Sequence, residues 1–414
     1  MLIGNPFLNE KFLWGGGNAI GSEGWTIGNM NTIRIGTRGS RLALRQAALV
    51  QAAIAEIDSS MKTELVILQT KGDQMQDRPL PAIGDKGVFS RELEQALLSG
   101  RVDLAVHSAK DLPMSLAMGL SIVAVLPRAD VRDVLVVPRG GRIPLPVLAE
   151  GGVGVYGKYE MARIEEGMTL SRKMPKDSGH VFRIGTGSRR RRILAGRVWE
   201  NVVCEEIRGN VDTRLKKLLE GRYDGILLAK AGLDRLGTDS DREETFDFYP
   251  LSPELFSPAA CQGIIAVEAV QGSVTARLCK KISDVETELC YLIEREALAQ
   301  LSADCSEPAA AWCRRTSSVP EEYRSLTRGL EISMVRQMEP SAVQKLEASS
   351  VGSLEAAYAA TLYGSEMAYP EDSILLDVMY AENKVRLIGA AEAAEGGRMA
   401  RRAAKMVKKQ TDWL

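Results

Sequence analysis

Hydrophobic positions alternate between two spacings along much of the chain from Thr32 onward. Short apolar runs predict strands, and apolar residues three or four positions apart predict helices, one of them bounded by glycine at each end. The order strand, helix, strand, helix predicts a parallel sheet covered by helices on both faces. The predicted strands are 32–36, 64–70, 102–108 and 120–126, and the predicted helices are 40–57 and 87–100.

The same alternation resumes after a long interruption. A strand at 182–188 runs into a glycine-rich turn, and further strands are predicted at 202–210 and 262–269, with helices between them. The stretch 224–233 is predicted as a strand that runs into a helix. These elements predict a second α/β unit. A long amphipathic helix at 284–301, two strands joined at Glu382-Asn383 and a basic helix near the end predict a smaller α+β unit.

We therefore predict an α/β protein with two α/β domains and a small α+β domain at the C-terminal end. The chain starts with a Gly/Asn-rich extension, and two aperiodic stretches are interpreted as insertions. The predicted limits are 1–32 for the extension, 33–131 completed by 262–283 for domain 1, 132–261 with an insertion at 139–182 for domain 2, and 284–414 with an insertion at 314–372 for domain 3.

The composition narrows the classes of function. The formal net charge of −1 provides no global attraction to nucleic acid or membrane. Six cysteines without a C-x-x-C pair and only two histidines argue against zinc ribbons and transition-metal centres. The chain has no run of about 20 apolar residues and no basic start followed by an apolar core, so we expect a cytoplasmic protein.

The segment VHSAKDLP at 106–113 is the first chemical candidate. It follows a predicted buried strand and sets Lys110 beside Asp111. An acid and a base at the end of such a strand are placed for catalysis.

The segment GTGSRRRR at 185–192 has three readings: a solvated basic face, a nucleic-acid patch, or an anion site. Its arginines follow a glycine-rich turn at a predicted helix start, where backbone N–H groups and the hydroxyls of Thr186 and Ser188 would converge on an anion. No aromatic residues interleave for base stacking, which weakens the nucleic-acid reading. Four arginines at comparable turns are expected to line a crevice suited to several carboxylates: Arg38, Arg208, Arg214 and Arg235.

Three other segments carry weaker signals. GVGVYG at 152–157 matches G-x-G-x-x-G, but it lacks a strong preceding strand and a following apolar helix, so we interpret it as a loop. Lys86, in a tight turn, fits an anion contact and an ordinary loop residue equally. Cys305, flanked by polar residues, fits a half-buried loop thiol or a nucleophile for covalent attachment.

Together these stretches resemble the porphobilinogen deaminase family, also called hydroxymethylbilane synthase. The resemblance covers most of residues 33–311. It rests on the ordered motifs IRIGTRGSRLALRQA, KGVFSRELEQALL, VDLAVHSAKDLP, RIGTGSRRRR, IRGNVDTRL, YDGILLAKAGLDRLG, PAACQGIIAVE and LSADC. It implies two domains like those of periplasmic binding proteins, with the active site between them, and a small third domain.

The resemblance also implies a reaction, a transfer in haem and tetrapyrrole biosynthesis. Four porphobilinogen molecules are joined head to tail with release of ammonia, and the linear tetrapyrrole hydroxymethylbilane is then hydrolysed off. The implied cofactor is one dipyrromethane per chain, bound through a thioether. We expect porphobilinogen as the partner of a monomer that binds no nucleic acid, no membrane and no metal.

Site residues follow from the same resemblance. Asp111 falls on the catalytic aspartate, which would stabilise positive charge on the pyrrole nitrogens and help move protons; His107 is interpreted as structural. Cys305 falls on the cofactor cysteine. The other implied cofactor contacts are Arg38, Ser40, Lys86, Ser108, Lys110, Thr186, Ser188, Arg190 and Arg191, and the implied substrate contacts are Arg38, Arg208, Arg214 and Arg235.

The chain departs from the family pattern at several positions. Ala303-Asp304 stands where two glycines usually precede the cofactor cysteine, and the acid is expected to disfavour the thiolate. Gly187 stands where serine is usual, Cys261 where glycine is usual, and Arg41 where proline is common. None of these departures removes the aspartate, the arginines or the cysteine.

Two other functions compete with the enzyme. A non-catalytic carboxylate-binding protein would share the fold, but the presence of both Asp111 and Cys305 favours the enzyme. Nucleic-acid binding through the run Arg189–Arg192 would show affinity that falls steeply with salt.

Overall fold

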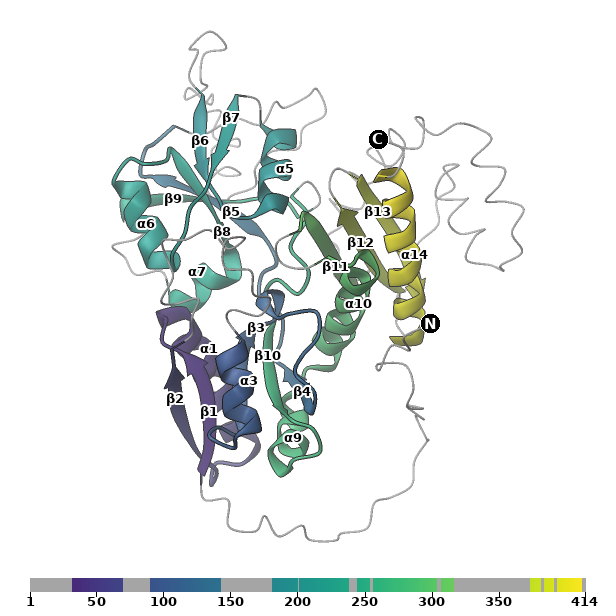
Figure 1. The fold of residues 1–414 in the computed structure, drawn as a ribbon. Coiled ribbons are helices and arrows are strands. Elements are labelled where there is room, and N and C mark those ends of the chain that lie inside the picture. The colour runs from purple at the N-terminus through teal and green to yellow at the C-terminus, as the bar shows by residue number, and fades with distance from the viewer. Residues whose placement is uncertain are drawn as a thin grey trace, which may run out of the picture. The chain divides into compact units, whose positions relative to one another are not determined.

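Three β-sheets organise the described part of the chain, two of five strands and one of three (Figure 1). The predicted extension, the larger part of both predicted insertions, Lys86 and Cys305 lie outside the described residues. The computed structural model describes residues 32–69, 90–142, 181–199, 201–237, 244–253, 256–303, 307–315, 373–380, 383–390 and 393–411.

The first sheet has the strand order β2-β1-β3-β10-β4. Strand β1 runs parallel to β2 and β3, whereas β10 runs antiparallel to both of its neighbours. Its strands are β1 (Thr32–Arg38), β2 (Lys62–Leu68), β3 (Leu104–Ser108), β4 (Leu120–Val125) and β10 (Ile265–Val270).

The second sheet has the order β7-β6-β8-β5-β9 and repeats this plan. Strand β6 is parallel to β7 and β8, and β5 is antiparallel to β8 and β9. Its strands are β5 (Asp133–Pro138), β6 (Phe182–Gly185), β7 (Val202–Glu205), β8 (Gly225–Ala229) and β9 (Phe246–Pro250).

The prediction of a parallel sheet is wrong for one strand in each of the two five-stranded sheets, because β10 in the first and β5 in the second run antiparallel to their neighbours. Strand β5 enters the second sheet directly from β4 of the first, and β10 returns directly from β9. A helical crossover within one sheet is what makes consecutive strands parallel, and these two strands arrive without one. Strands β5 and β9 are additional to the predicted elements.

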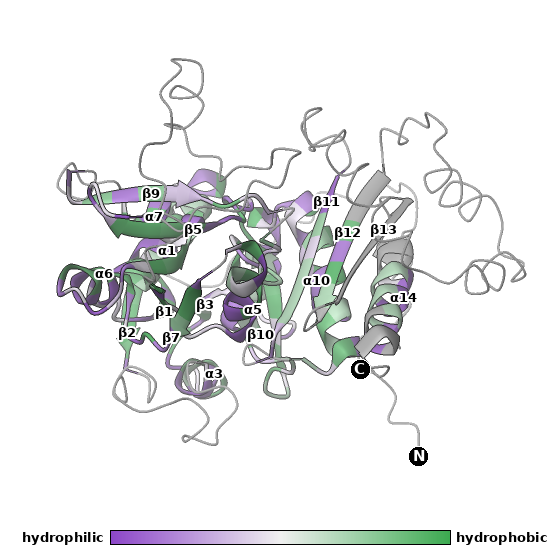
Figure 2. Cartoon of the chain, turned by 90° about the horizontal axis from the view of Figure 1, so that it is seen from above, coloured by the Kyte–Doolittle hydropathy of each residue, from purple (hydrophilic) through white to green (hydrophobic). Residues whose placement is uncertain are grey.

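Alternating side chains bury both faces of each large sheet. In β5, Leu135 and Val137 pack in one buried cluster and Val134 and Val136 in another, as the two-residue period of a strand requires. Hydrophobic colour therefore runs through these strands in Figure 2. The helices of the two units are α1 (Arg41–Ile57), α3 (Arg91–Leu98), α5 (Arg189–Val198), α6 (Val211–Leu219), α7 (Lys230–Leu236) and α9 (Val274–Cys279).

The third sheet is antiparallel, with the order β11-β12-β13. The pairing of Tyr380 with Asn383 matches the predicted connection, and β11 is additional to the prediction. Helices α10 and α14 pack against each other and against this sheet. The elements are α10 (Val285–Leu301), β11 (Ala309–Arg315), β12 (Ser373–Tyr380), β13 (Asn383–Ala390) and α14 (Ala393–Thr411).

The predicted fold class is confirmed: the protein is α/β, with two equivalent α/β units and a smaller α+β unit. The exact limits of the three domains stay predictions. Among the described helices, none is both long and apolar enough to span a membrane.

Candidate active site

A short turn at the end of β3 presents Asp111 to solvent. The 3-10 turn η2 (Ala109–Asp111) follows the strand, and the backbone N–H of Ala109 donates to the carbonyl of Ile264 at 3.0 Å. Ala109 and Leu112 are buried in an apolar cluster on either side of the exposed Asp111. A fixed backbone therefore holds an accessible carboxylate.

Lys110 precedes this carboxylate in the chain, and its side chain contacts Gln262. Its Nζ donates to Oε1 of Gln262 at 3.3 Å. Burial lowers the pKa of Lys110 to about 8, partly offset by the charge of Asp111. The ammonium group is thus charged at neutral pH and loses its proton in the mildly alkaline range.

Gln262 connects Lys110 to a buried ion-pair cluster. Its amide nitrogen donates to the carbonyl of Val131 at 2.7 Å and to Oδ1 of Asp133 at 3.0 Å. Asp133 accepts from Nη2 of Arg190 at 2.8 Å and from Nη2 of Arg191 at 2.7 Å. Burial acts to raise the pKa of Asp133, but the two guanidinium groups outweigh it and hold this pKa well below its ordinary value.

Arg190 and Arg191, both predicted cofactor contacts, are therefore occupied within the protein. Their relative exposures are 3% and 7%, and they also donate to the carbonyls of Ser257 and Leu227 respectively. The structure directs both guanidinium groups to Asp133, not to an open surface. Their role toward the cofactor stays a prediction.

Arg214, on α6 beside the second sheet, lies within electrostatic reach of Asp111 on the first. Burial and the nearby Arg191 lower the pKa of Arg214 to about 10, and Asp111 acts in the opposite direction. The Nε of Arg214 donates to the carbonyl of Gly209 at 2.7 Å, which fixes the side chain. The structure thus brings Asp111, Arg191 and Arg214 into one charged group.

Arg208 and Arg235 each have a partner on the protein. Nε of Arg208 lies 2.9 Å from Oε1 of Glu206. Nη2 of Arg235 donates to the carbonyl of Gly263 at 2.6 Å, and burial lowers the pKa of Arg235 to about 10. Gly263 has φ +89°, and a Cβ there would lie 2.4 Å from the carbonyl oxygen of Ala129, so only glycine fits.

The predicted hydroxyl contacts carry structural roles at helix starts. Ser40 caps α1 by accepting from the N–H of Ala43 at 3.2 Å, and Ser188 caps α5. Buried Thr186 accepts from the N–H of Ser188 at 3.2 Å. A hydroxyl that accepts one bond keeps its own proton for a ligand, so capping and ligand contact are compatible.

Ser108 and Arg38 stand at the ends of neighbouring parallel strands. The hydroxyl of Ser108 accepts from Nε2 of Gln46 at 2.8 Å, and half-buried Arg38 ends β1. Parallel strands bring their carboxyl ends to one edge of the sheet, which places both residues at the edge where Asp111 lies.

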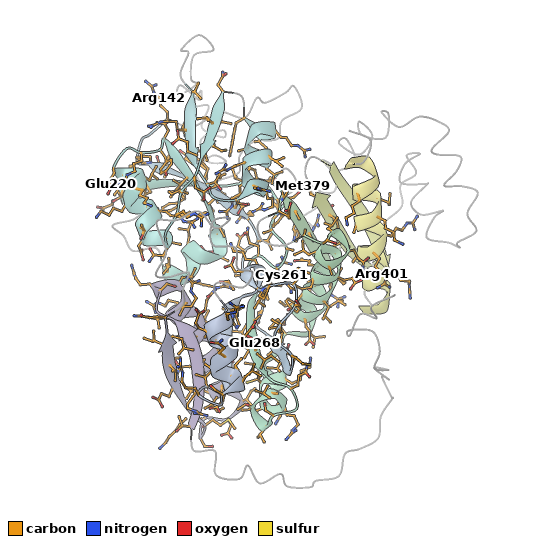
Figure 3. All side chains as sticks on the ribbon, viewed as in Figure 1. Arg142, Glu220, Cys261, Glu268, Met379 and Arg401 are labelled. Atoms are coloured by element: carbon orange, nitrogen blue, oxygen red, sulfur yellow. The ribbon has the colours of Figure 1, made fainter. Side chains whose placement is uncertain are left out.

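His107 pairs with a carboxylate in the core. Its Nε2 lies 2.9 Å from Oε2 of Glu268, which is labelled in Figure 3, and both side chains are buried. This contact lies within the sheet and fits the structural interpretation of His107. Among the described residues, no group of histidine, cysteine and acidic side chains is arranged to hold a metal ion.

The predicted cofactor cysteine, Cys305, comes after the long helix α10 in the chain. Helix α10 ends at Leu301, and Ser302 takes the left-handed conformation with φ 53°. Ala303, which stands where the family resemblance leads one to expect glycine, is fully buried in an apolar cluster. Cys305 itself lies outside the described residues.

Gln262, Asp133 and Glu206 belong to this site but were not predicted from the sequence. One signal for Asp133 was available: it is a lone charge at the start of the apolar run DVLVVP, and a buried strand charge requires a partner. Gln262 and Glu206 stand in polar, turn-rich segments where the sequence alone gives no such signal.

Comparison with known proteins agrees with these observations. Residues 33–277 match the family described as "Porphobilinogen deaminase, dipyromethane cofactor binding domain". Porphobilinogen deaminase of Roseiflexus castenholzii is 38% identical over 282 residues, which are 68% of this chain and 81% of that protein. The enzyme of Lachnospira eligens is 39% identical over 285 residues, covering 68% and 83%.

A solved structure is also similar, at lower identity. The alkanesulfonate-binding protein SsuA from Xanthomonas axonopodis pv. citri, bound to MOPS, shares 12% identity, with 76% of this chain and 82% of that chain covered and a TM-score of 0.33. The assignment of this chain rests on the sequence matches.

Proposed function

The chain belongs to the porphobilinogen deaminase family, and from this premise we propose how its site residues carry out the family's reaction. The enzyme joins four porphobilinogen molecules head to tail, releases ammonia at each addition and hydrolyses off hydroxymethylbilane. The observation that carries the proposal is the exposed Asp111 on its fixed turn, within electrostatic reach of Arg214.

Asp111 is the catalytic residue of this proposal. Loss of ammonia and attack by the next pyrrole put positive charge on the pyrrole nitrogens, and a preorganised carboxylate stabilises that charge. The turn holds the backbone of Asp111 in place, so the carboxylate needs little reorganisation during the reaction. The same group accepts the proton from the pyrrole carbon and delivers one to the leaving amine.

The arginines are the proposed carboxylate contacts. Each porphobilinogen carries an acetate and a propionate, so the growing chain is a polyanion. Guanidinium groups pair with carboxylates in a bidentate manner. Among them, Arg214 lies within electrostatic reach of both Asp111 and Arg208. Arg38 ends β1, which neighbours β3, and Arg235 lies on α7.

The described residues fit a bound dipyrromethane. Protonated Lys110, Arg38 and the capping hydroxyls of Ser40 and Ser188 are cations and donors, which a group bearing four carboxylates requires. When bound through Cys305, the dipyrromethane supplies the terminal pyrrole to which the first substrate is joined.

Intact-protein mass spectrometry tests the proposal. The purified chain, after incubation with porphobilinogen, is expected to carry a mass excess of two pyrrole units, and Cys305→Ser is expected to lack it. Cys204→Ser is a matched control, because Cys204 is a half-buried thiol on β7, and it should keep the excess. A chain without excess mass and without ammonia release would instead be a carboxylate-binding protein.

We further propose that the enzyme works in the cytoplasm as a monomer and binds no nucleic acid. The formal net charge of −1 supports the last point. Three arginines of the basic run are also engaged with carboxylates of the protein: Arg190 and Arg191 share Asp133, and Arg192 pairs with Glu206.

A further inference from the structure

Helix α5 begins with four consecutive arginines and has no acidic residue in its first turn. The positive end of the helix dipole and the like charges repel one another there. Two carboxylates compensate from outside the helix. Asp133 pairs with Arg190 and Arg191 in the interior, and Glu206 pairs with Arg192 at the surface.

Glu206 also binds a second arginine. Its Oε2 lies 2.6 Å from Nη2 of Arg192, and its Oε1 lies 2.9 Å from Nε of Arg208. Each oxygen thus serves one guanidinium group, which is the arrangement that a carboxylate ligand would adopt between two arginines. The hydroxyl of Tyr223 donates to the backbone carbonyl of Glu206 at 2.8 Å and holds its main chain in place.

Gly187 provides the space for this carboxylate. A Cβ at position 187 would lie 3.1 Å from Oε1 of Glu206 and 3.3 Å from the carbonyl oxygen of Ile207. A side chain at 187 would therefore require the Glu206 carboxylate to shift by a few tenths of an ångström, which would disturb its contact with Arg208.

The ion pair lies at an accessible position. The side chains of Glu206 and Arg192 are 42% and 39% exposed, so the Glu206 carboxylate can turn into water at little cost. Its charge also acts on Arg214, together with that of Asp111. Glu206 therefore belongs to the same charged group as the proposed catalytic residue.

We propose that Glu206 is a resident carboxylate: it occupies Arg192 and Arg208 until a carboxylate of the substrate chain displaces it, and so it sets the affinity of this subsite. The inference rests on the proposed function, since it names a competitor for the same arginines. Arg192 becomes a contact for the substrate carboxylate, in addition to the predicted arginines.

Steady-state kinetics of the full-length holoenzyme test this inference. Glu206→Gln keeps the shape of the side chain but removes its charge. We expect the KM for porphobilinogen to fall roughly two- to five-fold, because an exposed ion pair no longer competes with the substrate carboxylate. The kcat should stay within about two-fold of that of the unsubstituted enzyme. Glu205→Gln is the matched control, because it removes the same charge from the preceding exposed residue. Its KM should not change.

A double-mutant cycle adds a second, independent readout. Gly187→Ala adds the Cβ without a hydroxyl donor. It should weaken the contact of Glu206 with Arg208 and lower KM by itself, but it should have no further effect in the Glu206→Gln background. A higher KM in Glu206→Gln would overturn the inference, because Glu206 would then orient the arginines for substrate. An unchanged KM would overturn it too. An unsubstituted chain that consumes no porphobilinogen would instead refute the proposed function.

Discussion

Asp111 shows how one residue is kept both accessible and fixed. The backbone of its turn is held by the N–H of Ala109 on the carbonyl of Ile264, and buried Ala109 and Leu112 flank it. The residue itself is exposed and does not belong to the hydrophobic core. Function and stability are therefore separable at this position.

Asp111→Asn is expected to lower kcat roughly 100- to 1000-fold, the usual cost of removing one preorganised electrostatic group. The unfolding midpoint should stay the same, because the side chain is exposed. Ammonia release and thermal unfolding, measured on the same preparation, check both parts. Turnover near that of the unsubstituted enzyme would contradict the catalytic role.

The lowered pKa of Lys110 leads us to expect that kcat/KM depends on pH. Its pKa of about 8 lies below the ordinary value of 10.5, so the cation is present below about pH 8 and is lost above it. If this cation binds carboxylates, kcat/KM should fall as the pH rises through 8. Lys110→Arg stays charged and should keep its activity to higher pH. The same alkaline fall in both proteins would exclude Lys110 as its cause.

Cys261 takes a backbone conformation that its residue type disfavours. Its φ is 60°, in the left-handed region that favours glycine, and its thiol is buried. The surroundings hold it there, because its N–H donates to Oε2 of buried Glu294. Burial raises the pKa of the thiol well above its ordinary value, so Cys261 is not a reactive nucleophile.

At the scale of elements, strand β5 and helix α5 depend on each other. Asp133 is the first residue of β5, and it pairs with two arginines in the first turn of α5. Without it, two guanidinium groups would be buried unpaired near the positive end of a helix. The pair fixes how α5 lies on the second sheet and also orients Gln262.

Asp133→Asn should reduce the free energy of unfolding at pH 7 by about 3 kcal/mol, because a broken buried pair leaves uncompensated charge. Asp224→Asn breaks a partly exposed pair with Arg183 and should cost about 1 kcal/mol or less. Urea unfolding measures both.

The sign of the pH effect follows from the lowered pKa of Asp133. Since its pKa in the folded state is below the unfolded value, its contribution is present above about pH 4 and is lost as the pH falls through the folded pKa. The difference between the unsubstituted protein and Asp133→Asn should therefore shrink below pH 4. A constant difference down to pH 2 would contradict this assignment.

At the scale of the whole described molecule, Glu294 connects the two segments that cross between the large sheets with a strand of the third sheet. This buried carboxylate on α10 pairs with Arg128, between β4 and β5, through two contacts of 2.5 and 3.2 Å. It also accepts the N–H of Cys313 on β11 at 2.7 Å and that of Cys261 before β10. Both chain crossings between the large sheets thus share one anchor with the third sheet.

Glu294→Gln is expected to destabilise the protein by about 3 kcal/mol or more, since Arg128 would stay buried without its counter-charge. Glu288→Gln, in the same helix, removes an exposed pair with Lys280 and should change stability by about 1 kcal/mol or less. Chemical denaturation followed by far-UV circular dichroism compares the two. Equal midpoints would mean that Glu294 is not the anchor.

The sequence by itself determined the local elements, the family and the position of Asp111. Hydrophobic period and turn residues act over a few neighbouring positions, so strands such as 102–108 and the helix 284–301 could be predicted directly. The antiparallel direction of β5 and β10 could not be predicted, because strand direction depends on where the chain crosses between sheets.

Only the tertiary structure decided which charges meet. The sequence presents Arg189–Arg192 as one basic run, whereas the fold directs Arg190 and Arg191 inward to Asp133 and Arg192 outward to Glu206. Ion pairs form between residues far apart in the chain, and their energy depends on distance and burial. No local pattern encodes either quantity, so the partners of these arginines emerge only when the strands and helices are packed.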